Sequence, residues 1–174
     1  IFGVYMGLVK ILLVAVFTCV FSLSAHADDK FGYAPDISLR STLGKSISLS
    51  DYRGKVVLIN FWATWCKPCL KELPHLQKIY KDLKNENFIV LGINVDEARD
   101  ISKVKPLTKR YRLEFPILLD PEKTTLSKYN PDLSIPFSVV VDKDGYIYAY
   151  FNGYHPGMEN EIKKAVEEKL DGAG

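Results

Sequence analysis

The chain has 174 residues, which is a typical length for one domain and short for two. Hydrophobic residues make up 47% and charged residues 25%, a balance that indicates a globular chain and excludes a disordered one. The formal net charge of +2 provides no basic excess of the kind that binds nucleic acid or an anionic membrane surface, so neither partner is expected.

Residues 1–27 have the order of a secretory signal peptide. Lys10 precedes an apolar run over residues 11–23, and a small-x-small sequence ending at Ala27 follows that run. The run is shorter than the roughly 20 residues of a membrane span. An uncleaved N-terminal anchor is the alternative, and it would be the chain's one contact with a membrane. We therefore expect export, with a mature domain over 28–174 in the periplasm or elsewhere outside the cytoplasm.

The mature chain is predicted to begin with a β-hairpin. Residues 37–39 and 47–49 each alternate apolar and polar side chains, and Gly44 lies between them at a turn. A strand over 56–62 follows, and its continuous, mostly β-branched apolar run indicates burial on both faces.

A helix is predicted over 68–84, because apolar residues recur there at steps of three and four and Pro68 suits a first helical turn. Pro74 is expected to kink this helix. Strands that alternate with helices and end in a hairpin and a last helix predict an α/β fold, with a central mixed β-sheet flanked by helices on both faces. The other predicted elements are strands over 88–94, 116–119, 137–141 and 146–151, and helices over 101–112, 121–129 and 159–170.

The cysteines provide the first indication of function. Cys19 lies in the signal segment, so the mature chain keeps Cys66 and Cys69. A structural disulfide gains stability mainly by closing a long loop, and this pair would close a very short one, so the pair is either redox-active or part of a metal site. Cys66 precedes a helix N-terminus, which stabilises a thiolate, and Lys67 adds a positive charge. We expect Cys66 to attack a partner's disulfide and Cys69 to resolve the mixed disulfide.

The sequence around the two cysteines also carries a family resemblance. Residues 60–69, Asn-Phe-Trp-Ala-Thr-Trp-Cys-Lys-Pro-Cys, resemble the active-site stretch of the thioredoxin superfamily. The continuation Leu-Lys-Glu-Leu-Pro over 70–74 is similar to its exported TlpA/ResA-like branch, and segments 48–55 and 134–137 fit that branch as well. The similarity spans roughly residues 31–170. It implies a thioredoxin fold of AhpC/TSA-redoxin type with an N-terminal β-hairpin extension, and a redox-active disulfide in place of any cofactor.

Further site residues follow from the resemblance. Pro136 matches the family's cis-proline, which packs beside the cysteine pair, and the backbone of Ile135 would then pair with an extended substrate segment. Trp65 would flank the exposed sulfur, and Lys67 and Pro68 complete the surface expected to contact the substrate. Taken without the family, Pro136 is simply a proline that enters a strand.

Glu72 matches an acidic residue that this branch keeps near the cysteines. It lies one turn after Cys69 on the predicted helix, where a carboxylate can take the proton of Cys69 as the mixed disulfide resolves. The alternative is a solvated helix residue. Asn60 occupies the position of thioredoxin's buried acid and cannot exchange a proton near neutral pH, so that role moves to Glu72. Glu97, which follows another buried strand, is the second candidate.

Three other functions share parts of this pattern. A thiol peroxidase of peroxiredoxin type is disfavoured, because Ala63 and Ile59 stand where the Thr/Ser and Pro of its motif would precede Cys66. A metal-binding protein would need ligands besides the cysteines, and outside the signal segment the histidines are His75 and His155. A non-enzymatic adaptor of thioredoxin fold would have no need of both cysteines.

The direction of electron flow follows from the compartment and the family together. Compartments outside the cytoplasm are oxidising, which suits an oxidase directly, whereas a reductase needs a membrane thiol electron donor. The resemblance favours the reductase, acting on the disulfides or thiols of exported proteins, such as apocytochrome c during cytochrome c maturation. The sequence therefore predicts a protein-disulfide oxidoreductase that works as a reductase.

Overall fold

The structure is a computed structural model that describes residues 31–172. The predicted signal segment, with Cys19, lies outside the described residues and stays a prediction. Between residues 31 and 172, no helix is both long and apolar enough to cross a membrane. The elements in chain order are β1 (Ser38–Ser41), β2 (Ser46–Ser48), the 3-10 helix η2 (Leu49–Tyr52), β3 (Val56–Trp62), α2 (Lys67–Leu83), β4 (Phe88–Asn94), the 3-10 helix η3 (Ala98–Lys103), α3 (Val104–Arg110), β5 (Ile117–Leu119), α4 (Thr124–Tyr129), β6 (Phe137–Val141), β7 (Ile147–Asn152) and α5 (Met158–Asp171).

The strands form one sheet of seven in the order β2-β1-β5-β4-β3-β6-β7. β4 runs parallel to both β3 and β5, whereas the remaining neighbours pair antiparallel. The register of the central pair runs from Val56 opposite Phe88 to Trp62 opposite Asn94. The predicted mixed sheet and the N-terminal β1–β2 hairpin are therefore confirmed.

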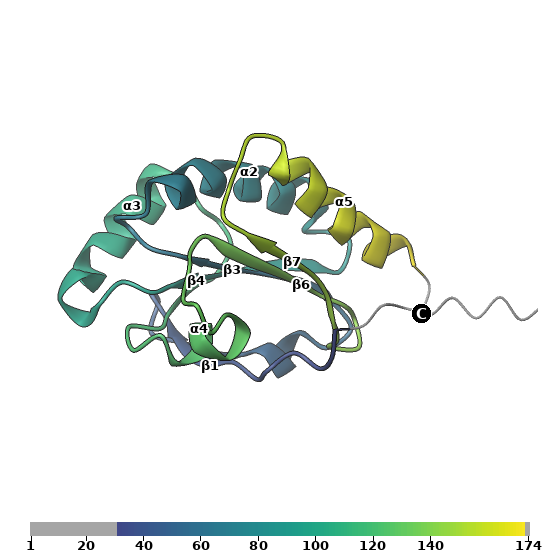
Figure 1. Ribbon diagram of the computed structural model, residues 1–174, viewed down its shortest axis with the longest axis horizontal. Helices are drawn as coiled ribbons and strands as arrows, with labels where there is room; N and C mark the ends of the chain where they lie inside the picture. The colour runs from purple at the N-terminus through teal and green to yellow at the C-terminus, as the bar shows by residue number, and fades with distance from the viewer. Residues whose placement is uncertain (1–30, 173–174) are drawn as a thin grey trace, which may run out of the picture.

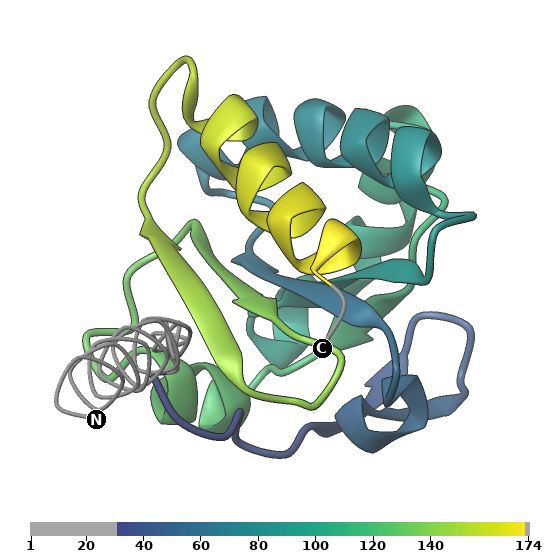
Figure 2. The same ribbon diagram turned by 90° about the vertical axis from the view of Figure 1, so that its right-hand side faces the viewer.

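Helices cover both faces of the sheet, as the sequence predicted. Figure 1 shows α2, α3 and α5 on one face and α4 on the other. In Figure 2 the last helix, α5, lies beside α2 over the sheet. These layers bury the sheet from both sides and leave its two ends free to carry loops.

β3 and β4 form the centre of the core. Every residue of both strands is buried, in agreement with the continuous apolar runs expected of strands covered on two faces. Each large apolar side chain that is fully buried contributes about 1.5–3 kcal/mol relative to its exposed state. Trp62, which was predicted to be a core residue, has no exposed surface. The carboxyl end of β3 is therefore a fixed point from which the next turn starts.

α2 continues from Lys67 to Leu83 and includes Pro74. Leu73 and Leu76 are fully buried against the sheet, whereas Pro74 lies on the exposed side of the helix. The apolar stripe anticipated from the steps of three and four thus holds α2 in place, and the proline does not end it.

Two predicted helices differ from the observed ones at their starts. The predicted helix over 101–112 is split into η3 and α3, because Pro106 lacks an N–H and suits only the first turn of α3. The helix predicted over 121–129 begins at Thr124 instead. There the carboxylate of Asp120 accepts hydrogen bonds from the N–H groups of the second and third residues of α4 and caps it.

Candidate active site

Cys66 lies in the turn between β3 and α2 and is the N-cap residue of α2. Its Sγ accepts a hydrogen bond from the N–H of Cys69 at 3.2 Å, and its carbonyl accepts one from the N–H of Leu70 at 3.0 Å. The two cysteines form a disulfide, with their Cα atoms 5.3 Å apart. The N–H groups of the first helical turn therefore point at Cys66, which is the arrangement that stabilises a thiolate after reduction.

The two sulfurs differ in access. Cys66 keeps 4% of its surface exposed, whereas Cys69 has none. Trp65, directly before Cys66, exposes 62% of its surface, and Lys67 and Pro68 are exposed as well. A partner that approaches the pair therefore meets Cys66 first, within a surface made of these three side chains.

Glu72 lies about one helical turn after Cys69 on α2 and is buried, with 1% of its surface exposed. Its Oε2 accepts a hydrogen bond of 2.9 Å from Nδ2 of Asn60, and the same Nδ2 donates to Oγ of Ser138 at 2.9 Å. Asn60 is on β3 and Ser138 is opposite it on β6, so two strands hold the acid of α2 in place. The alternative that Glu72 is a solvated helix residue is therefore wrong.

Burial decides the protonation of Glu72. Removal from water raises the pKa of Glu72 to about 7, although the hydrogen bonds with Asn60 and Ser138 act in the opposite direction. A carboxyl group with that pKa is present in both forms near neutral pH and can both take up and release a proton. Asn60 is therefore a hydrogen-bond donor to the buried carboxyl group of Glu72.

The Ile135–Pro136 peptide bond is cis, the geometry that the family resemblance implies. Pro136 directly precedes β6, whose first residue Phe137 pairs with Phe61 near the end of β3. The carbonyl of Pro136 accepts a hydrogen bond from the N–H of Gly153 at 2.8 Å. The pairing of β6 with β3 thus puts the cis-proline loop at the end of the sheet that carries Cys66.

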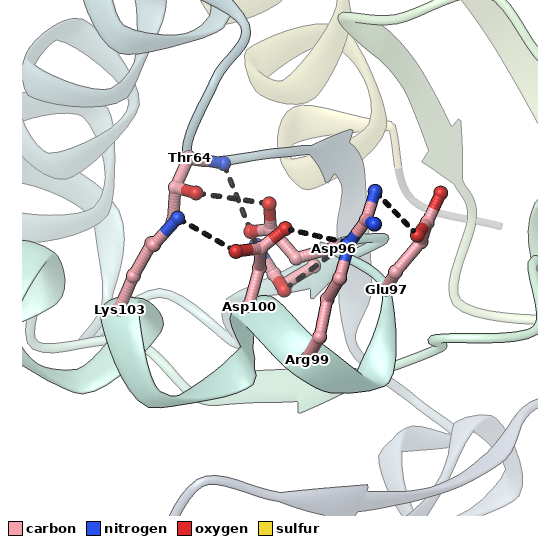
Figure 3. Close-up of polar contacts among 7 residues, drawn as sticks. Thr64, Asp96, Glu97, Arg99, Asp100 and Lys103 are labelled. Carbon is pink, nitrogen blue, oxygen red and sulfur yellow. Dashed lines mark hydrogen bonds and ion pairs between the residues drawn. The ribbon is translucent and has the colours of Figure 1, made fainter.

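A buried carboxylate that the sequence reasoning missed lies beside the same turn. Asp96 follows β4 and keeps 1% of its surface exposed, and it accepts two hydrogen bonds from Thr64 (Figure 3). Glu97, the second candidate for the proton acceptor, is exposed and pairs with Arg99 at 3.0 Å. The two acids are adjacent in the sequence and follow a strand buried on both faces, so the sequence pattern does not tell which of them points inward.

The histidines do not join the cysteines. His75 stacks against Tyr154 and lies 3.9 Å from the carboxylate of Glu159, and His155 is exposed. In the part of the chain that the structure describes, no three His, Cys, Asp or Glu side chains are grouped as metal ligands. The described residues therefore offer the cysteine pair no further ligands.

Comparison with known proteins gives the family of the chain. The model of the AhpC/TSA family matches residues 32–150. The thiol-disulfide oxidoreductase ResA of Bacillus thuringiensis subsp. konkukian is 35% identical over 137 residues, which are 79% of this chain and 74% of that protein.

Solved structures extend the likeness to the fold. A thiol:disulfide interchange protein of the thioredoxin family from Chlorobium tepidum matches with a TM-score of 0.70 and 27% identity, over 83% of this chain and 99% of that one. A secreted thiol-disulfide isomerase from Corynebacterium glutamicum matches with a TM-score of 0.71 and 28% identity, over 86% and 96% of the two chains. The predicted thioredoxin-like fold is therefore confirmed.

Proposed function

The chain belongs to the AhpC/TSA family and is a thioredoxin-like thiol-disulfide oxidoreductase of the ResA type, and from this premise we propose that it reduces disulfides of exported proteins. The observation that carries the proposal is the buried acid one helical turn after Cys69, since Glu72 has a pKa of about 7. A reductase must remove the proton of its buried second thiol in every turnover, and Glu72 supplies an acceptor.

The first step of the proposed reaction takes place at Cys66. Its thiolate attacks one sulfur of a substrate disulfide, so that a Cys66–substrate bond forms and the other substrate sulfur leaves as a thiolate. The N-terminal N–H groups of α2 stabilise the attacking thiolate before the step. Cys69, fully buried, takes no part in this encounter.

The second step resolves the mixed disulfide. Cys69 gives its proton to the Glu72 carboxylate and attacks Sγ of Cys66, which forms the Cys66–Cys69 disulfide seen in the structure. The second substrate sulfur leaves as a thiolate and takes a proton from solvent. The substrate disulfide has then gained two electrons, the protein dithiol has lost two, and Glu72 returns its proton to solvent.

Substrate binding is assigned to the surface around Cys66. We assign contacts with the partner to Trp65, Lys67 and Pro68, and backbone pairing with an extended segment to Ile135 before the cis-Pro136. Main-chain pairing is tolerant of sequence, so it suits an enzyme that acts on several exported proteins.

The location and the electron source complete the proposal. The relatives named ResA and the secreted isomerase from Corynebacterium glutamicum support a site of action outside the cytoplasm. That compartment is oxidising, so a membrane thiol donor has to return the pair to the dithiol form. The disulfide of apocytochrome c is the substrate that the family resemblance favours.

The reduction potential of the Cys66–Cys69 pair tests the direction. Equilibration against glutathione and dithiothreitol buffers should give a value near or below about −250 mV, as in thioredoxin-like reductants. A value near about −120 mV would make the protein a donor of disulfides and would overturn the reductase proposal.

A further inference from the structure

Backbone pairing between β3 and β4 ends just before the reactive turn. The last pair in register is Trp62 with Asn94, and the N–H of Val95 donates to the carbonyl of Trp62 at 2.9 Å. The chain then turns through Thr64 to Cys66 before α2 begins. Within the turn itself, the N–H of Cys66 donates to the carbonyl of Ala63 at a longer 3.2 Å.

Beyond the last backbone pair, the carboxylate of Asp96 links the turn after β3 to the end of β4. Its Oδ2 accepts the backbone N–H of Thr64 at 2.9 Å, and its Oδ1 accepts the Thr64 hydroxyl at 2.9 Å. Oδ2 also accepts Nδ2 of Asn94 at 2.7 Å, and the N–H of Asp96 donates back to Oδ1 of Asn94 at 3.2 Å. Both carboxylate oxygens are thus used, and the end of β4 orients the group.

The cations nearby have other partners. Figure 3 shows Asp96 turned towards Thr64, while the side chains of η3 contact one another. Arg99 pairs with Glu97 at 3.0 Å and with Asp100 at 3.6 Å, and Lys103 pairs with Asp100 at 2.6 Å. The buried carboxylate thus accepts hydrogen bonds from Thr64, which supplies two donors, and from Asn94.

We propose that Asp96 is a positioning residue for thiol–disulfide exchange, and that it holds Thr64 so as to fix the turn that presents Cys66. The inference rests on the exchange activity and holds for either direction of electron flow. Attack on a disulfide needs the incoming sulfur in line with the S–S bond, and a misplacement of about 1 Å costs up to about 10²-fold in rate. Asp96 touches neither the substrate nor the sulfurs, so it acts through Thr64.

The hydrogen-bond pattern predicts which variants keep this function. D96N places its Oδ1 where Oδ2 was, so it still accepts the Thr64 N–H, and its Nδ2 donates to the Thr64 hydroxyl, which can accept as well as donate. T64S keeps both bonds, whereas T64V keeps the backbone bond alone. D96A removes both.

Asp120 provides a matched control for the loss of a buried carboxylate. It also exposes 1% of its surface, follows the parallel strand β5, and accepts N–H groups of the chain that follows it. D120A therefore costs stability in the same way as D96A, but it uncaps α4 on the other face of the sheet.

The experiment measures the second-order rate constant with which the reduced full chain reacts with hydroxyethyl disulfide, below the melting temperature of every variant. We expect a loss of about tenfold for D96A and of about threefold for T64V, with D96N, T64S and D120A within about twofold of the wild type. Adding T64V to D96A should change nothing further, because the bond is already lost.

The opposite results would overturn the proposal. An equal loss of rate in D96A and D120A would assign the effect to general stability. An unchanged rate in T64V and D96A would show that the turn keeps its geometry without the bonds between Asp96 and Thr64. A D96N rate as low as that of D96A would assign the effect to charge. If D96A does not fold, T64V against T64S makes the same comparison. The reduction potential of the wild type tests the proposed direction separately, since these rates do not depend on it.

Discussion

The side-chain amide of Asn60 donates a 2.9 Å hydrogen bond to the carboxylate of Glu72 in the interior of the protein. The two residues come from different elements, β3 and α2, and Ser138 on β6 accepts a second bond from the same amide. Burial favours the protonated acid, and the amide favours the carboxylate. Their balance sets the pKa of Glu72 at about 7.

The first prediction concerns the resolving step. Glu72→Gln should slow the release of substrate from the mixed disulfide by about 10²-fold, because general base catalysis of this kind contributes at least that much. In the wild type this rate should rise with pH through about 7, as Glu72 loses its proton. Rapid-quench kinetics of the mixed disulfide from pH 5 to 9 measures both the rate loss in E72Q and the pH dependence of the wild type.

E161Q, at an exposed acid on α5, serves as the control. Identical pH profiles for E72Q and the wild type would remove Glu72 from the mechanism.

A second prediction tests the partner of the acid. Asn60→Ala removes the donor that stabilises the Glu72 carboxylate, so the pKa of Glu72 should rise above about 7. The pH at which resolution reaches half its maximal rate should then move upwards. Ser138→Ala should move it in the same direction, because the Ser138 side chain also lowers the pKa of Glu72, and by less, because Asn60 has the larger effect. A shift to lower pH in N60A would contradict the arrangement.

The same pKa has a consequence for stability. The folded-state pKa of Glu72, about 7, lies above its ordinary value of 4.5, so the folded protein holds this proton more tightly than the unfolded chain. The stability that results is complete below pH 4.5 and is lost as the pH rises through 7. Relative to E72Q, the oxidised wild type should lose on the order of 3 kcal/mol of unfolding free energy between pH 4 and 8. Urea unfolding of both proteins at the two pH values checks this, and a parallel pH dependence would argue against a buried, titrating Glu72.

The cysteines should separate into two roles. Cys66→Ser should abolish exchange, because the accessible sulfur is lost, whereas Cys69→Ser should trap mixed disulfides at Cys66. Non-reducing electrophoresis after exposure to a disulfide-bonded protein such as insulin detects the trapped species, and C66S is the matched control. Trapping by C66S rather than by C69S would reverse the assignment.

The packing of the central strands yields a prediction independent of the redox site. A Cβ added at Gly92 would lie 2.9 Å from side-chain atoms of both Ile117 and Phe115, which is too close for carbon atoms in contact. Gly92→Ala should therefore cost about 1–3 kcal/mol through overpacking. The shift of the urea midpoint at unchanged slope measures it. An unchanged midpoint would mean that β5 moves aside without cost.

Much of the fold could be predicted because the local signals agree with the tertiary structure. The apolar run over 56–59 predicts a buried strand, and the stripe of Leu73 and Leu76 predicts a helix packed on the sheet; both predictions are confirmed. The start of α4 was harder to predict. It depends on the Asp120 carboxylate, which accepts N–H groups of the helix, and not on Pro121, which is next to it in the sequence and predicts an earlier start.

The sequence indicates which residues form the candidate site, but not the hydrogen bonds that hold them in position. Cys66, Cys69 and Glu72 carry their own sequence signal, since steps of three residues put them on nearly the same face of the helix start, in successive turns. The contacts of Asn60 with Glu72 and of Asp96 with Thr64 join residues 12 and 32 positions apart. Such contacts depend on strand register, which a single sequence does not specify.

The N-terminal hairpin affects a property unrelated to the redox site. Because β1 pairs with β5, the unsatisfied N–H and C=O groups of β5 are not offered to other proteins, and the border of the sheet moves to β2, which is only three residues long. At the other border, the segment around Tyr33 bridges to Tyr146 beside β7. Open strand borders recruit foreign chains and seed aggregates. The described sheet therefore offers other chains little open strand border with which to pair.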